Sequence, residues 1–140
     1  MSVRSWHTRS PAETRALGAL LAPELLPARA LLLTGDLAAG KTVLAQGVAS
    51  ALGIDPAEVQ SPTFTLVREH RGAQGRLLHL DLYRLEPAQT SSLGLEELLA
   101  EPAIKVIEWA ERLPLRVPGA LALHVARVDE ETRRVEEVAP

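Results

Sequence analysis

The chain has 140 residues, a length that predicts one domain over 1–140. Of these residues 46% are hydrophobic and 24% are charged, which is the composition of a globular protein. It has no cysteine, which excludes a disulfide scaffold, a thiolate zinc site and a cysteine nucleophile. The net charge of −3 argues against a free-standing nucleic-acid binder, because such proteins normally carry a strongly basic face.

The first predicted element is a helix that begins after Ser10. Ser10 can cap this helix, Pro11 suits its first position, and Glu13 completes a capping box. The short apolar run over 30–34 predicts a strand buried on both faces. The Ala-rich segment over 42–52 has its larger apolar side chains on one side, which predicts a second helix.

The remaining predicted elements are two β-hairpins with a short helix and a strand between them. Their ranges in chain order are 63–70 with 76–82 for the first hairpin, 93–99 for the helix, 103–107 for the strand, and 121–128 with 133–138 for the second hairpin. Helices and buried strands followed by hairpins predict an α/β fold with a mixed sheet.

Two sequence features bear on location. The longest apolar run, over 30–33, is far too short to span a bilayer, and the first ten residues lack the apolar segment of a signal peptide. We therefore expect a cytoplasmic protein with no membrane partner.

A phosphate-binding motif joins the predicted strand at 30–34 to the helix that follows. Residues 35–42 read Gly-Asp-Leu-Ala-Ala-Gly-Lys-Thr and match G-x-x-x-x-G-K-[ST] in full. Glycines let the backbone N–H groups surround a phosphate, and the helix N-terminus adds partial positive charge. Lys41 is then a charge for the β- and γ-phosphates, and Thr42 offers a hydroxyl to Mg²⁺. The guanine-specificity run N-K-x-D or T-K-x-D is absent from the sequence, which favours ATP over GTP.

A P-loop enzyme also needs a carboxylate near the magnesium ion, at the end of an apolar strand. Asp81 ends one such run and Glu108 ends another, and the sequence leaves open which of them contacts the metal directly. His79 lies on the strand face of Asp81 and could support that carboxylate, but an ordinary hydrogen-bonded strand histidine is the favoured interpretation.

Four ordered motifs go beyond a generic P-loop. They are the P-loop at 35–42, Ser-Pro-Thr-Phe-Thr-Leu at 61–66, His-Leu-Asp-Leu-Tyr-Arg-Leu at 79–85 and Val-Ile-Glu-Trp at 106–109. This series resembles the TsaE (YjeE) family, small bacterial ATPases required for threonylcarbamoyladenosine modification of tRNA. The resemblance implies a P-loop NTPase-like three-layer fold, with a mixed, mainly parallel central sheet and flanking antiparallel hairpins.

The resemblance also implies roles for individual residues. Catalytic roles fall on Lys41, Asp81 and Glu108, and magnesium ligation on Thr42 and Glu108 with Asp81 beside them. The residues expected to bind the nucleotide are Gly35, Ala38, Ala39, Gly40, Lys41, Thr42 and Val43 around the phosphates, with Pro11, Thr14 and Arg133 on the adenine side. Ser61, Thr63 and Thr65 would form a switch that moves with nucleotide state.

Two positions depart from the family pattern. Ala38 replaces a glycine that is usual in the loop, and Thr132 stands where a glycine often precedes the hairpin arginine. The second departure leaves open whether Arg133 or Arg134 takes the position of that arginine. The resemblance further implies that Trp109 either packs near the site or fills the core, with partial burial the favoured interpretation.

The cofactors implied by the family are ATP or ADP and Mg²⁺, and the implied partner is the TsaB–TsaD heterodimer. The chain would reach tRNA only through that complex, which agrees with its acidic charge. Weak hydrolysis without partners is expected, because the sequence offers no evident arginine finger. Two alternatives stay open: a small P-loop kinase, and a nucleotide-gated binding module without turnover.

Overall fold

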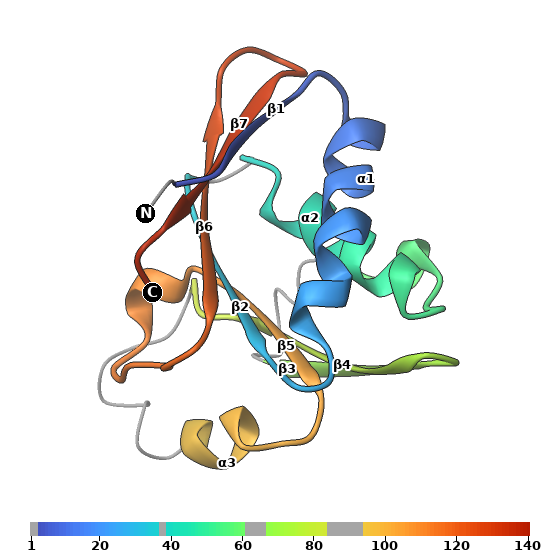
Figure 1. Cartoon of the computed structure of the whole chain (residues 1–140), viewed down its shortest axis with the longest axis vertical. Helices are drawn as coiled ribbons and strands as arrows, with labels where there is room; N and C mark the ends of the chain where they lie inside the picture. The colour runs from blue at the N-terminus through green and yellow to red at the C-terminus, as the bar shows by residue number, and fades with distance from the viewer. Residues whose placement is uncertain (1–2, 37–38, 61–66, 84–93) are drawn as a thin grey trace.

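A sheet of seven strands runs through the described part of the chain and carries helices on both faces (Figure 1). The structure is a computed structural model that describes residues 3–36, 39–60, 67–83 and 94–140. The strands are β1 (Ser5–Thr8), β2 (Ala30–Thr34), β3 (Val67–Gly72), β4 (Gly75–Asp81), β5 (Ile104–Glu108), β6 (Leu121–Arg127) and β7 (Arg133–Val138). The helices are α1 (Pro11–Leu21), α2 (Lys41–Ala51) and α3 (Leu95–Leu99).

The strand order β1-β7-β6-β2-β5-β4-β3 places β2 and β5 at the centre of the sheet. The four central strands β6, β2, β5 and β4 pair in parallel, and the β6–β7, β7–β1 and β4–β3 pairs are antiparallel. The predicted α/β fold with a mixed, mainly parallel centre and antiparallel hairpins is thereby confirmed. Because parallel strands end at the same edge, residues that follow β2, β4 and β5 lie close together there.

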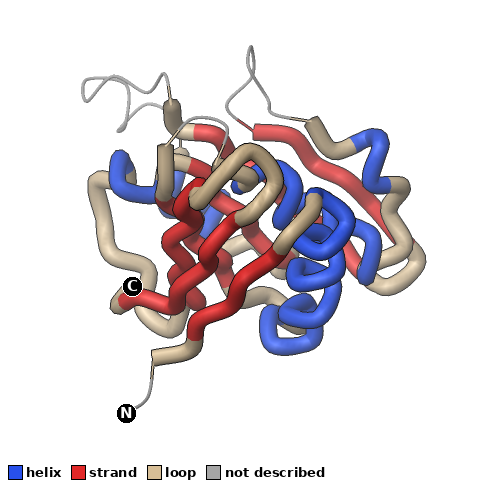
Figure 2. The backbone as a smooth tube through the Cα atoms, turned by 90° about the horizontal axis from the view of Figure 1, so that it is seen from above, coloured by secondary structure: helices blue, strands red, loops and turns tan. Residues whose placement is uncertain are grey.

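Helices α1 and α2 pack side by side on one face of the sheet (Figure 2). Their backbones touch: a Cβ atom added to Gly47 would lie 2.0 Å from the carbonyl oxygen of Arg15. Leu44 and Val48 of α2 are fully buried against this face of the sheet. The close contact fixes the start of α2, and with it the position of the P-loop.

The other face is covered by α3, by a 3-10 turn at Ala110–Arg112 and by the segment that follows that turn. Leu80, Ile107 and Leu95 are buried in this second apolar cluster. The two clusters on opposite faces form the three layers that the family resemblance implies. Among the described helices, none combines the length and the apolar composition needed to cross a membrane.

The boundaries of the first helix and of the last hairpin follow the predicted signals. Ser10 Oγ accepts from the Glu13 backbone N–H at 3.1 Å, as predicted, but the Glu13 carboxylate accepts from the N–H of Arg9 rather than from that of Ser10. At the turn of the last hairpin, Asp129 Oδ1 accepts from the N–H groups of Glu131 and Thr132.

Two parts of the sheet differ from the prediction. Strand β1 was not predicted, because its four residues carry a weak local pattern and become a strand by pairing with β7. In the first hairpin the strands extend closer to the turn than expected. Gly72 pairs with Gly75, so only Ala73 and Gln74 form the turn rather than 71–75. Residues 63–66 of this predicted hairpin lie outside the described residues.

Candidate functional site

The P-loop begins where β2 ends, as the motif predicts. Gly35 has a φ of 138° and Gly40 a φ of 108°, conformations that side chains with a Cβ atom rarely adopt. Gly40 is the residue before α2, and the helix starts at Lys41. The first N–H groups of a helix point out of its start, and together with the partial positive charge there they favour an anion at the loop.

Lys41 is buried at this point, with only 4% of its surface exposed. Its Nζ donates to the carbonyl oxygen of Gly35, and to that of Asp36 at 3.1 Å. The same atom lies 3.9 Å from the ring centroid of Trp109. Burial lowers the pKa of Lys41, and nearby carboxylates, led by that of Glu108, oppose this shift. A phosphate bound here would place negative charge beside the buried Lys41 ammonium group and stabilise its positive charge.

Glu108 and Thr42 are joined directly across the site. The Thr42 hydroxyl lies 2.9 Å from Oε1 and 2.8 Å from Oε2 of Glu108, whose exposure is 3%. Asp81 pairs with Glu108 in the β4–β5 register, so the two carboxyl-bearing residues stand side by side at the strand ends. Asp81 Oδ1 also accepts from the backbone N–H of Tyr83 at 2.9 Å.

His79 supports Glu108 rather than Asp81. Its Nε2 lies 2.6 Å from Glu108 Oε2, and the imidazole is fully buried. The favoured interpretation as an ordinary strand histidine is therefore incomplete, because this side chain contacts the carboxylate that also holds Thr42. The sequence carried no signal for this contact, since it depends on the pairing of β4 with β5.

The oxygen atoms of Thr42, Glu108 and Asp81 fit Mg²⁺ in the form that accompanies a nucleotide. This ion takes hard oxygen ligands and is usually bound by one or two carboxylates together with substrate phosphates and water. Within the described residues no group of three or more His, Cys, Asp or Glu side chains could hold a metal ion alone.

The P-loop geometry and the paired carboxylates can now be compared with known proteins. The family model described as "Threonylcarbamoyl adenosine biosynthesis protein TsaE" matches residues 8–135. The chain belongs to the TsaE family.

Curated relatives and a solved structure support this assignment. The tRNA threonylcarbamoyladenosine biosynthesis protein TsaE of Nostoc sp. is 43% identical over 88% of this chain and 78% of the relative. The protein of the same name from Bacillus subtilis is 35% identical over 96% and 85%. The crystal structure of Bacillus subtilis YdiB matches with a TM-score of 0.76 and 32% identity, over 99% of this chain and 86% of that one.

The TsaE-family residues expected on the adenine side lie near one another. Thr8 pairs with Arg133 in the β1–β7 register, and its hydroxyl lies 2.6 Å from that of Thr14 in α1. A Cβ atom added to Gly40 would lie 3.6 Å from Nε of Arg133, so this side chain lies against the P-loop. Pro11 is exposed at the start of α1. Their roles as nucleotide contacts stay predictions.

Several predicted residues fall outside the described residues: Ala38 of the P-loop, and Ser61, Thr63 and Thr65 of the predicted switch. Ala39 is buried and Val43 half-buried beside the described part of the loop.

Trp109 is half-buried, as favoured, and it also lies at the site. Its φ of 58° is a left-handed conformation, unusual for a bulky residue and frequent at functional sites. The Tyr83 ring packs on it with centroids 4.8 Å apart. Partial burial and proximity to the site, which the sequence left as alternatives, therefore both hold for Trp109.

Proposed function

We propose that this chain is a Mg²⁺-dependent ATPase that acts with the TsaB–TsaD heterodimer in threonylcarbamoyl modification of the adenosine next to the anticodon of tRNA. The observation that carries the proposal is the contact between the Thr42 hydroxyl and the Glu108 carboxylate, directly beside Lys41. Relatives named for tRNA threonylcarbamoyladenosine biosynthesis support the choice of pathway.

Each side chain has a distinct task under this proposal. The N–H groups at the start of α2 and the Lys41 ammonium bind the phosphates and stabilise the charge that develops during transfer. Thr42 and Glu108 hold Mg²⁺, which neutralises phosphate charge when bound. Asp81 would orient the attacking water, because it ends the strand next to that of Glu108.

Water is the phosphoryl acceptor in this proposal, as opposed to a small metabolite. In the described part of this edge, six positions separate β2 from α2, and the segment from β5 to β6 contains one 3-10 turn, Ala110–Arg112; neither is an inserted domain that would close over a second substrate. Weak turnover of the isolated chain is expected. At the carboxyl ends of the parallel strands, Lys41 is the buried lysine of the described residues that could stabilise phosphate charge. Partner proteins would then raise the rate.

The test is phosphate release from ATP and Mg²⁺, with and without TsaB–TsaD. Wild type is compared with Glu108→Gln, which keeps the side-chain shape but removes the charge. Glu96→Gln is the matched control, because Glu96 is exposed on α3 on the opposite face. We expect the partners to stimulate wild type and the control alike, and Glu108→Gln to lose at least about tenfold in rate.

Other outcomes identify the alternatives. Transfer of labelled γ-phosphate to a small acceptor would identify a kinase. Nucleotide-dependent affinity for the partners without any turnover would identify a gated binding module. Stimulated hydrolysis that is unchanged in Glu108→Gln would contradict the proposed role of this carboxylate.

A further inference from the structure

His79 is a fully buried imidazole on β4, next to the edge strand β3, and it is hydrogen-bonded to the Glu108 carboxylate of the candidate site. In the register of β4 and β5, His79 pairs with Val106, and Asp81 pairs with Glu108. The 2.6 Å contact between His79 Nε2 and Glu108 Oε2 therefore runs diagonally between neighbouring strands (strands labelled in Figure 1). Both side chains project to the face that α2 covers.

The surroundings of the ring determine which nitrogen carries the hydrogen. Glu108 Oε2 is an acceptor, so His79 Nε2 must donate. His79 Nδ1 is buried and has no hydrogen-bond partner among the described residues. The ring therefore offers its Nε2–H to the Glu108 carboxylate.

The His79 contact holds Glu108 more firmly than the Thr42 contact does. One hydroxyl proton of Thr42 is shared by two carboxylate oxygens that lie 2.9 and 2.8 Å away, so it satisfies one of them at a time. If Glu108 turned away from Thr42, His79 would lose its hydrogen-bond partner inside the core. Thr42 is half-buried at the start of α2, so its hydroxyl can change partner while Glu108 stays in place.

We propose that His79 is a positioning residue that holds the Glu108 carboxylate toward Thr42 before any ligand arrives. This inference rests on the proposed function, since its consequence is that Mg²⁺ with a nucleotide meets two oxygen ligands already in place. Residues that orient metal ligands in this way typically contribute ten- to a hundredfold to metal affinity.

Two substitutions separate the donor from the space that the ring fills. His79→Gln keeps an N–H donor at a similar distance from the backbone, and His79→Leu keeps apolar volume without a donor. His70→Leu is the matched control. His70 lies on the neighbouring strand β3 and has no contact to Glu108. Its Nε2 is also buried and has no hydrogen-bond partner in the part of the chain that the structure describes.

The first measurement needs no nucleotide. Imidazole ¹⁵N chemical shifts of the full chain report which nitrogen of His79 carries the hydrogen, and they should show it at Nε2. The Nε2 signal should shift in Glu108→Gln and stay in place in Glu96→Gln. A ring without a hydrogen at Nε2 would overturn the proposal, whatever the ATPase rates are.

The second measurement is ADP affinity by calorimetry, in EDTA and over a range of Mg²⁺ concentrations. We expect His79→Leu to need about tenfold more Mg²⁺ for the same gain in ADP affinity. Its affinity in EDTA should match wild type within about threefold, because the P-loop contacts are unchanged. His79→Gln should recover most of the Mg²⁺ response, and His70→Leu should retain all of it.

The outcomes separate this inference from the proposed function. If wild type gains affinity with Mg²⁺ and His79→Leu gains equally, the positioning role fails and the proposed function stands. Equal loss in His79→Leu and His79→Gln would also overturn the donor role. If wild type binds ADP with no response to Mg²⁺, the proposed function fails and the inference fails with it.

Discussion

Lys41 and Lys105 are the only lysines in the chain, and they are buried at opposite ends of the parallel strands. Their exposed fractions are 4% and 3%, and burial lowers the pKa of both. Each ammonium group also donates to backbone carbonyls: Lys41 to those of Gly35 and Asp36, and Lys105 to that of Ala28 at 2.9 Å. By burial, pKa direction and hydrogen bonding, the two lysines are nearly equivalent.

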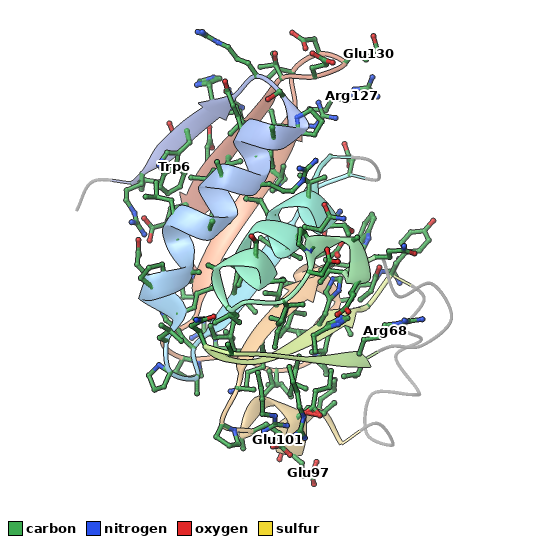
Figure 3. The ribbon with its side chains drawn as sticks, turned by 90° about the vertical axis from the view of Figure 1, so that its right-hand side faces the viewer. Trp6, Arg68, Glu97, Glu101, Arg127 and Glu130 are labelled. Atoms are coloured by element: carbon green, nitrogen blue, oxygen red, sulfur yellow. The ribbon has the colours of Figure 1, made fainter. Side chains whose placement is uncertain are left out.

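Their surroundings differ. Carboxylates of the strand ends, including Glu108 and Asp81, act on Lys41, which also lies over the Trp109 ring and beside a helix N-terminus. The carboxylate that acts on Lys105 is that of Glu101, which follows α3. Figure 3 shows Glu101 at one end of the molecule, with Glu130 of the last hairpin at the other end. A buried lysine therefore indicates a functional site only when the groups around it can bind a ligand.

The largest expected effect is on ATP turnover, which should depend on Lys41 and not on Lys105. Under the proposed function, Lys41→Met should lower ATP turnover by at least about a hundredfold, because it removes the positive charge proposed to stabilise the transferring phosphate. The melting temperature should stay equal or rise, since a buried ammonium group is removed. Phosphate release and thermal melting measure the two quantities, with Lys105→Met as the control. Equal ATP turnover of Lys41→Met and Lys105→Met would contradict the conclusion that only Lys41 belongs to the functional site.

A second prediction concerns the carboxylates around Lys41. Asp81→Asn should lower turnover by about ten- to a hundredfold, because a positioned carboxylate is replaced by a neutral amide. The fold should be unaffected, because an Asn oxygen can still accept from the Tyr83 N–H. Single-turnover phosphate release and a melting curve test both statements. A rate within about threefold of wild type would contradict a catalytic role for Asp81 and leave it a structural role in the turn with Tyr83.

Lys105 provides the corresponding structural prediction. Lys105→Met should leave turnover and ADP affinity unchanged and raise the free energy of unfolding by about 1 kcal/mol, because an apolar side chain avoids the cost of burying a charge. The half-buried Ala28 carbonyl can exchange the lost donor for water. Denaturant unfolding measures the change, and a clear loss of stability would show that the bond to Ala28 outweighs desolvation.

The smallest effect is a dependence on pH. Since folding lowers the pKa of Lys105, the unfolded chain binds more protons there, and wild-type stability rises as pH passes from the lowered value toward the unfolded value of about 10.4. Lys105→Met lacks this gain. Its advantage over wild type should therefore shrink between about pH 7 and pH 10, as melting temperatures at each pH would show. A constant difference would contradict a lowered pKa.

Local signals predicted the part of the site that is continuous in sequence. The strand over 30–34, the glycine turn and the helix that begins near Lys41 follow one another, so their geometry depends on neighbouring residues. The meeting of Asp81 with Glu108 was expected only because both end apolar runs. Their alignment is a matter of register between β4 and β5.

Contacts that depend on distant pairing were not predictable in the same way. The bond from His79 to Glu108 joins residues 29 positions apart and needs the order β5-β4, which no local pattern specifies. Strand β1 likewise exists because β7 pairs with it from the far end of the chain. The sequence thus indicated which side chains form the site. The contact from His79 that supports Glu108 could be seen only in the fold.

The position of Trp109 gives the protein a built-in optical reporter. Its indole lies 3.9 Å from the Lys41 ammonium, and any movement of that charge toward a phosphate changes the electric field at the ring. The chain has one other tryptophan, Trp6, on β1 (labelled in Figure 3). Replacing Trp6 by Phe would leave Trp109 as the single tryptophan, whose fluorescence we expect to report on the loop without any attached dye.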